Sequence, residues 1–231
     1  MPHDYETALI WTNGRVNPHL GTRFDATGRF LPEAGNTVVA QVIPGSPTET
    51  ALVGLRASLM ALPEAGHFAF TEVASYHMTV FEGVIETRRD AEHWPAGLPL
   101  DMPMAEATTQ MIARLQGWQA PPAFAMRIIE VTPFGLRLTG ATAEDEAVAR
   151  DWRDRLSAAF GLRRASHSSY GFHTTLAYCK AGLPPQALPA LRAQMDALTT
   201  RMQAEIPVMH LARPNFCTFA DMNGFPPVHP L

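Results

Sequence analysis

Two stretches of the sequence alternate polar with apolar side chains, and in each of them a histidine precedes a threonine by two residues. They are residues 76–81, which read YHMTVF, and residues 171–178, which read GFHTTLAY. Alternation of this kind, in segments rich in β-branched and aromatic residues, predicts two half-buried β-strands. Because successive side chains of a strand point to opposite faces, each strand is expected to present its histidine and its threonine together.

The two predicted strands divide their side chains between two faces. The set expected to share the histidine face comprises His77, Thr79 and Phe81 in the first strand and His173 and Thr175 in the second. The set expected on the opposite face comprises Met78, Val80, Thr174, Leu176 and Tyr178. Two histidine faces turned toward one cleft would bring two imidazoles and two hydroxyls around one small anionic group.

Both strands occupy the same place in a repeat that spans most of the chain. The first copy reads as strand 37–43, helix 48–62, the first histidine strand, helix 104–115 and strand 124–131. The second copy reads as strand 135–139, helix 142–160, the second histidine strand, helix 186–205 and strand 208–212. This repeat predicts an α+β fold of two pseudo-symmetric lobes, each an antiparallel-rich sheet with outer helices, and an active-site cleft between them.

The segments outside the repeat are shorter and richer in turn residues. We expect one domain with an N-terminal cover over residues 1–36, repeats over 37–131 and 132–221, and a tail over 222–231. Short strands are expected at residues 10–11 in the cover, at 68–70 before the first histidine strand, and at 215–221. The first repeat also carries an insertion within residues 82–103, which indicates either a lid or specificity element or a surface decoration.

A pair of histidines can divide the work of acid–base catalysis at a phosphodiester. A neutral imidazole takes a proton from water or a ribose hydroxyl, and a protonated imidazole gives one to the leaving oxygen. The candidate catalytic residues are therefore His77 and His173, and the sequence does not say which is acid and which is base. The hydroxyls of Thr79 and Thr175 are candidate donors to the phosphate oxygens. No cluster of histidines and acids has zinc-ligand spacing, so no metal or other cofactor is expected.

The extended motifs, residues 77–84 (HMTVFEGV) and 170–178 (YGFHTTLAY), resemble the paired His-x-Thr-x motifs of the 2H phosphoesterase superfamily. That superfamily includes RNA 2′,3′-cyclic phosphodiesterases and RNA ligase-like proteins, and this chain is similar to a bacterial branch whose substrate is unknown. The resemblance implies a metal-independent phosphodiesterase that acts on a cyclic phosphate or an RNA or nucleotide phosphodiester. It also implies His77 and His173 as acid and base, and Thr79 and Thr175 as phosphate ligands.

Five other residues are weighed as substrate contacts. Arg127, the lone cation of an apolar strand, is interpreted as either a solvent-facing charge or a phosphate contact. His167 lies in the loop before the second motif, where it either touches substrate or is solvated. Tyr170 could stack on a base or fill the core. The same alternatives hold for Tyr178, for which its place opposite His173 favours core filling. Asn36 is expected to serve a turn, with a ligand contact as the alternative.

Composition limits the class of partner. The chain has a formal net charge of −4, which argues against an extended nucleic-acid surface and favours a small phosphorylated substrate or an RNA end. No run of 18 apolar residues is present, so no membrane span is expected. The first residues lack a basic segment followed by an apolar core, and the two cysteines lack ligand spacing. These features predict a cytoplasmic protein with buried free thiols; the oligomeric state stays open.

An alternative function from another class uses the same residues. A non-catalytic module could hold a nucleotide or another phosphorylated ligand in the same cleft without turnover. Two intact histidines favour the enzyme, because a pure binding module has little use for two proton carriers.

Overall fold

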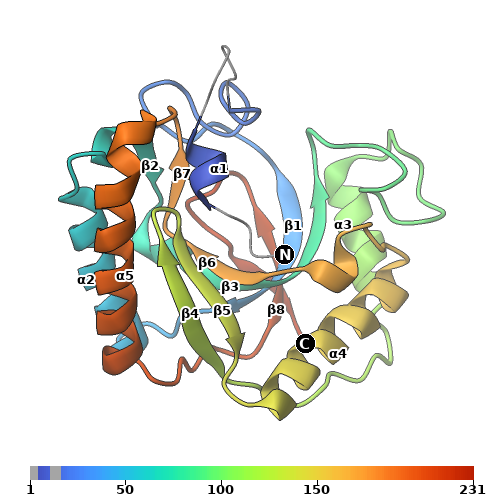
Figure 1. Cartoon of the computed structure of the whole chain (residues 1–231). Coiled ribbons are helices and arrows are strands. Elements are labelled where there is room, and N and C mark those ends of the chain that lie inside the picture. The colour runs from blue at the N-terminus through green and yellow to red at the C-terminus, as the bar shows by residue number, and fades with distance from the viewer. Residues whose placement is uncertain (1–4, 11–16) are drawn as a thin grey trace.

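Strands from both copies of the repeat form one antiparallel sheet in the computed structural model, which describes residues 5–10 and 17–231 (Figure 1). Among the described residues this sheet has seven strands in the order β4-β5-β6-β3-β1-β8-β9, and a two-stranded sheet pairs β2 with β7. The strands are β1 (Gly35–Gln41), β2 (Phe68–Phe70), β3 (His77–Ile85), β4 (Met126–Thr132), β5 (Gly135–Gly140), β6 (Phe172–Thr175), β7 (Ala177–Cys179), β8 (Asn215–Phe219) and β9 (Pro227–Pro230).

The two histidine strands, β3 and β6, are neighbours near the centre of the large sheet. Their register pairs Met78 with Thr174, and both side chains are fully buried. This pairing joins the strands β3, β1, β8 and β9 to the strands β6, β5 and β4. The predicted α+β fold with antiparallel sheets and outer helices is confirmed, and the sheets of the two halves are continuous through the histidine strands.

Five α-helices are present in the described residues, and four of them flank the sheet. They are α1 (Tyr5–Leu9), α2 (Pro47–Met60), α3 (Met104–Ala113), α4 (Ala143–Phe160) and α5 (Leu188–Glu205), with short 3₁₀ helices η1 (Ala65–His67), η2 (Val73–Ser75), η3 (His167–Ser169) and η4 (Pro185–Ala187). Figure 1 shows α2 and α5 together on one side of the molecule, and α3 and α4 on the other. Helix α5 packs against β4, and α4 packs against β5 and β3.

The ends of the long helices follow from their capping residues. Thr142 caps α4, and its hydroxyl and the Asp145 carboxylate each bond the other residue's backbone amide in a capping box. Helix α2 starts at Pro47, whose fixed φ suits the first helical position, and its N-cap is Ser46. The predicted start of this helix at residue 48 was therefore one residue late.

The last strand of each sequence repeat lies in the other half of the sheet. Strand β4, which ends the first repeat, pairs with β5, the first strand of the second repeat. Strand β8, near the end of the second repeat, pairs with β1. The boundary between the sequence repeats therefore does not separate the two halves of the structure.

Three predicted segments differ in the structure. Residues 208–212 form no strand. They make only two isolated bridges, Met209 with Met126 at the start of β4 and Leu211 with Val42 just after β1. The predicted tail over 222–231 contains β9, which adds an edge strand to β8. Ile10 follows helix α1 and belongs to no strand, and its predicted strand partner Trp11 lies outside the described residues.

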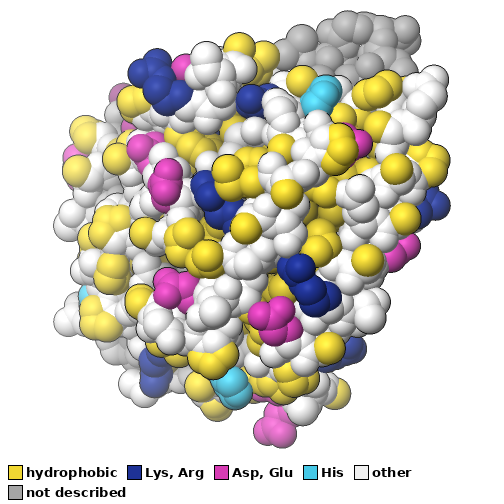
Figure 2. Space-filling view, turned by 90° about the vertical axis from the view of Figure 1, so that its left-hand side faces the viewer, with side chains coloured by type: hydrophobic (Ala, Val, Ile, Leu, Met, Phe, Trp, Pro, Cys, Tyr) yellow, Lys and Arg dark blue, Asp and Glu magenta, His cyan; other side chains and the backbone are white. Residues whose placement is uncertain are grey.

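The outer surface over α2 and α5 shows no large patch of one charge. Figure 2 looks onto this face, where basic and acidic side chains are scattered singly among apolar and uncharged atoms. None of the helices within residues 5–10 and 17–231 is both long and apolar enough to cross a membrane.

Candidate active site

The four motif side chains line a single cleft over the centre of the sheet. His77 and Thr79 enter it from β3, and His173 and Thr175 enter it from β6. The cleft has a volume of about 120 Å³. The strand alternation expected from the sequence therefore holds at these four positions, and the two motifs meet at one place.

The two histidine rings are held in the same way. The Nδ1–H of His77 donates to the carbonyl oxygen of Ser75 at 2.6 Å, and that of His173 donates to the carbonyl oxygen of Gly171 at 2.9 Å. A carbonyl oxygen can only accept, so each Nδ1 must carry the proton. The Nε2 atom of each neutral ring is then left as a proton acceptor, and both rings line the cleft.

The surroundings of the two rings differ. His77 is half-buried, and its ring lies 4.2 Å from the ring of Phe225, whereas His173 is exposed to solvent. Burial lowers the pKa of His77 to about 4; the bond to the Ser75 carbonyl opposes this shift and the nearby His173 adds to it. At neutral pH, His77 is therefore held as a neutral base.

A β-bulge follows Thr79 and reverses the expected alternation of β3. Thr79 pairs with Val39 and Phe81 with the adjacent Val38, so Val80 is an extra residue without a partner in β1. Phe81 consequently turns into the core, against the expectation that it shares the histidine face, and it does not line the cleft.

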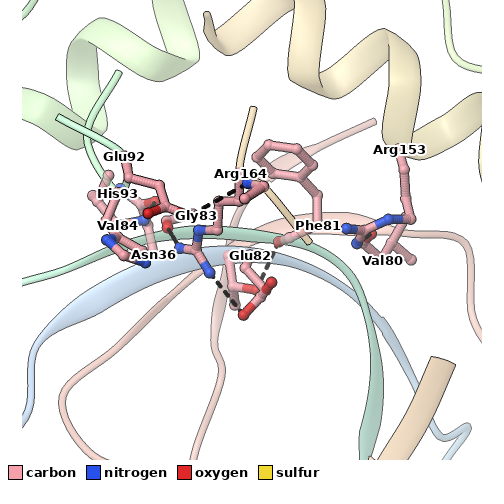
Figure 3. Close-up of polar contacts among 12 residues, drawn as sticks. Asn36, Val80, Phe81, Glu82, Gly83, Val84, Glu92, His93, Arg153 and Arg164 are labelled. Atoms are coloured by element: carbon pink, nitrogen blue, oxygen red, sulfur yellow. Dashed lines mark hydrogen bonds and ion pairs between the residues drawn. The ribbon is translucent and has the colours of Figure 1, made fainter. Parts of the chain in front are cut away.

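A buried arginine donates a hydrogen bond to the backbone carbonyl of the extra residue at this bulge. The Arg153 guanidinium donates from Nη1 to the Val80 carbonyl oxygen at 2.6 Å (Figure 3). Arg153 is 3% exposed. From the sequence we interpret Arg150, Arg153 and Arg155 as surface charges of this helix, and for Arg153 that interpretation is wrong. The spacing of Arg153 from Ala149, Leu156 and Phe160 puts it on the buried stripe of α4, and that spacing is the sequence signal for its burial.

A second irregularity in β3 lies at Gly83 and Val84. The side-chain oxygen of Asn36 accepts from the Val84 amide at 3.1 Å, and Arg164 donates to the Gly83 carbonyl oxygen at 2.7 Å. A Cβ at position 83 would lie 2.1 Å from the Asn36 side-chain oxygen, so only glycine fits there. Asn36 is thus a buried residue of β1 that supports the irregularity and lines the cleft, and the predicted turn role was wrong.

The bulge at Val80 turns Glu82 into the cleft. Its carboxylate accepts from Nη1 of Arg164 at 2.7 Å, and Arg164 comes from the second half of the chain (Figure 3). Neither residue was among the candidates from the sequence. A strict period of two would have placed Glu82 on the Met78 face, and the bulge at Val80 moves it to the histidine face.

The strand that carries the second motif is also irregular. The amides of Leu176 and Ala177 both donate to the carbonyl oxygen of Phe134, at 2.7 and 3.1 Å, so two successive N–H groups point the same way. Tyr178 therefore lines the cleft instead of filling the core opposite His173, as was expected. Glu82 and Tyr178 each lie five positions after a catalytic-candidate histidine, so they are equivalent in the two halves.

The three less certain sequence candidates lie outside this cleft. Arg127 is exposed on β4, separated from β3 by two strands. His167 is 5% exposed and its Nε2 lies 2.9 Å from a carboxylate oxygen of Asp154, so it ties η3 to α4 instead of touching solvent or substrate.

Tyr170 combines packing with proximity to the site. Its ring lies 5.8 Å from that of His173, and the Arg153 guanidinium lies 3.7 Å from its centroid. Burial raises the pKa of Tyr170 above its ordinary value, and its hydroxyl is enclosed. Tyr170 also lines a larger groove, of about 860 Å³, that shares His173 and Thr175 with the cleft.

The insertion within residues 82–103 contributes four residues to the cleft: Glu82, Gly83 and Ile85 from the end of β3, and Arg88 just beyond it. The rest packs locally: the Arg89 guanidinium lies 4.5 Å from the ring of Trp94 and pairs with Glu86 at 2.6 Å, and His93 pairs with Asp90 at 2.7 Å. Within the part of the chain that the structure describes, no group of three or more His, Cys, Asp or Glu side chains could hold a metal ion. Cys179 and Cys217 are buried free thiols, as expected.

Comparison with known proteins finds a matching family and matching solved structures. Residues 23–137, which include the first motif, match the family described as 2H-phosphodiest, domain of unknown function (DUF1868). The conserved protein of unknown function ATU0111 from Agrobacterium tumefaciens str. C58 has a crystal structure that matches with 43% sequence identity and a TM-score of 0.92, over 94% of both chains. No curated protein matches. The resemblance inferred from the two motifs is confirmed: the chain belongs to the 2H phosphoesterase superfamily, in the 2H-phosphodiest family.

Proposed function

We propose that the protein is a metal-independent phosphodiesterase that hydrolyses a cyclic phosphate, or an RNA or nucleotide phosphodiester, by paired-histidine acid–base catalysis. One observation carries the proposal: two histidines with their Nδ1 protons fixed by backbone carbonyls line one cleft, each with a threonine beside it. A binding module would need donors to the phosphate, but it would not need two oriented proton acceptors.

His77 acts as the base and His173 as the acid. Burial keeps His77 neutral, so its Nε2 can take a proton from the attacking water as the new P–O bond forms. His173 is exposed and can take up a proton from solvent, which it gives to the leaving oxygen as the old P–O bond breaks. The product is a phosphomonoester and an alcohol. For a cyclic phosphate both groups stay on one molecule.

Thr79 and Thr175 hold the phosphate between the two rings. Their hydroxyls donate to the non-bridging oxygens, where negative charge grows in the transition state. Both are half-buried on the histidine face. A single neutral donor of this type contributes less than a proton carrier, which sets the order of the mutational effects.

The test is turnover of 2′,3′-cyclic nucleotides, ADP-ribose cyclic phosphate and short oligonucleotides with cyclic ends, measured in EDTA. His77→Ala and His173→Ala should each lower kcat by about 10²–10⁴, and Thr79→Val and Thr175→Val by about 10–10³. The double histidine variant should lose much less than the product of the two, because the pair acts as a unit. Arg155→Met removes one exposed charge of α4 and should leave turnover unchanged.

Three results would contradict the proposal. Turnover that survives in both histidine variants would show that the pair is not the catalytic group. Tight binding of these compounds without turnover by the wild type would support the binding module instead. Loss of turnover in EDTA would indicate a metal hydrolase.

A further inference from the structure

Three arginines line the end of the cleft that lies away from the histidine pair. Arg23 comes from the N-terminal segment, Arg88 follows the end of β3, and Arg164 precedes η3. His77 is the first residue of β3, whereas Arg88 lies just beyond its last residue, Ile85. The cleft thus runs along β3, with the imidazoles at one end and the guanidinium groups at the other.

Two of these arginines have carboxylate partners. Arg23 donates from Nε to Glu33 at 2.7 Å, and Glu33 is itself buried and accepts from Thr87 at 2.9 Å. Arg164 pairs with Glu82, and its side chain is only 9% exposed. These contacts fix both guanidinium groups in place before any ligand arrives.

Arg88 has no such partner. Its half-buried side chain makes no hydrogen bond or ion pair with any described residue, and its Nε is enclosed without a partner among them. Burial lowers the pKa of Arg88, and repulsion from Arg164 lowers it further, while attraction by Glu82 and Asp90 opposes part of this shift. A guanidinium withdrawn from water without an acceptor is costly, and an anion bound beside it would remove that cost.

The charges at this end of the cleft do not cancel. Among the residues that line the cleft, three guanidinium groups face one carboxylate, that of Glu82, which leaves an excess of positive charge. Two further acids lie outside the lining: Glu33 pairs with Arg23, and the exposed Asp90 attracts Arg88 but pairs with His93. The whole chain carries a net charge of −4, so this excess is local to the cleft. A concave site with such an excess concentrates anions.

We propose that Arg88, supported by Arg23 and Arg164, forms a second phosphate subsite, and that the substrate is a phosphodiester that carries another phosphate group. The inference rests on the proposed function for the placement of the first phosphate at the histidines. Glu82 lies five positions after His77, roughly 16 Å along an extended strand, and side chains reaching in from both ends shorten this span. A nucleotide with phosphates on both sides of its ribose fits this arrangement.

The first experiment measures binding and needs no turnover. Adenosine 2′-monophosphate and adenosine 2′,5′-bisphosphate are titrated into the full-length protein by calorimetry. The bisphosphate should bind about 10–100-fold more tightly, because a charge-assisted hydrogen bond contributes 1.5–3 kcal/mol. Arg88→Met should abolish this ratio, and Arg155→Met, which removes the same charge from the surface of α4, should keep it.

The second experiment separates this inference from the proposed function. Adenosine 2′,3′-cyclic phosphate and its 5′-phosphorylated form are compared as substrates, and wild type should favour the second by a similar ratio in kcat/KM. Equal binding of the two adenosine probes by the wild type, or a ratio that Arg88→Met preserves, would overturn the second subsite even if both cyclic compounds are hydrolysed. A ratio in binding without hydrolysis of either compound would support the subsite and contradict the phosphodiesterase.

The unliganded variant supplies an independent check. Arg88 makes no side-chain bond with the described residues and is repelled by Arg164, so Arg88→Met should fold and should melt at or above the wild-type temperature. A clear drop in melting temperature would mean that Arg88 serves the fold, and would count against a ligand role.

Discussion

The buried imidazole of His77 makes the stability of the fold depend on pH in a way that can be worked out. Burial lowers its pKa to about 4 from the ordinary 6.5. Between these values the unfolded chain binds a proton that the folded chain does not, so stability falls as the pH drops through this window. Across this window the free energy of unfolding changes by about 1.4 kcal/mol per pH unit. The ring is only half-buried, so we expect the whole change to be at most about 3 kcal/mol.

The perturbation that isolates this term is His77→Asn. The asparagine amide can still donate to the Ser75 carbonyl, but it cannot gain a proton. Urea unfolding of wild type and variant between pH 4 and 7.5 should show the wild type losing up to about 3 kcal/mol more than the variant as the pH falls. Other groups that titrate in this range, such as His167, whose pKa burial also lowers, are present in both proteins and cancel in the difference.

Thr79→Ser provides the matched control, since it changes the same cleft without removing a titratable group. Its effect on stability should be the same at every pH. If the difference between wild type and His77→Asn is equally constant, His77 is not a neutral buried base, and its assignment as the proton acceptor loses its support.

Two further predictions test the irregular part of β3. Arg153→Met should lower the free energy of unfolding by about 1–3 kcal/mol, because it leaves the Val80 carbonyl buried without a donor; Arg155→Met, two positions along and exposed, should change it by less than about 0.5 kcal/mol. Equal effects would contradict the role of Arg153. Gly83→Ala should cost about 1–3 kcal/mol, since its Cβ meets Asn36, whereas Gly54→Ala, in open space on α2, should gain about 0.5–1 kcal/mol in the same urea titration. Full tolerance of the alanine at position 83 would show that the strand relaxes there.

The sequence predicts the part of the site where strand geometry is regular. At His77 and Thr79, and at His173 and Thr175, alternation with period two gives the right face, because these residues precede the irregularity in each strand. Periodicity also places most of the helices and strands within a few residues of their observed ends. The faces of the two histidines were therefore accessible from the residue pattern, whereas their selection as a candidate catalytic pair drew mainly on the family resemblance of the two motifs.

The remaining cleft residues lie beyond those irregularities, where pattern is not sufficient. A single extra residue in a strand moves every later side chain to the other face. Phe81 and Tyr178 were assigned to the wrong face for this reason, and Glu82 was not among the candidates. The bulge at Val80 depends on Arg153, which lies 73 positions away in the chain. A local window of sequence contains no sign of that contact.

The exchange of strands between the halves explains why residues of the second half set the backbone geometry of β3 in the first. Strand β8 completes the sheet beside β1, and β4 completes it beside β5, so neither repeat has its full sheet alone. The same crossing of the halves recurs at the level of side chains, where Arg153 and Arg164 bind the two irregular carbonyls of β3. Because these guanidinium groups hold Glu82 in the cleft, the first motif acquires its final geometry only when both halves are folded together. The repeat in the sequence thus predicts the two equivalent histidines. The two halves differ at Glu82, whose equivalent is Tyr178, and at Arg88, whose side chain has no bonded partner among the described residues. Recognition of a particular substrate would depend on these differences.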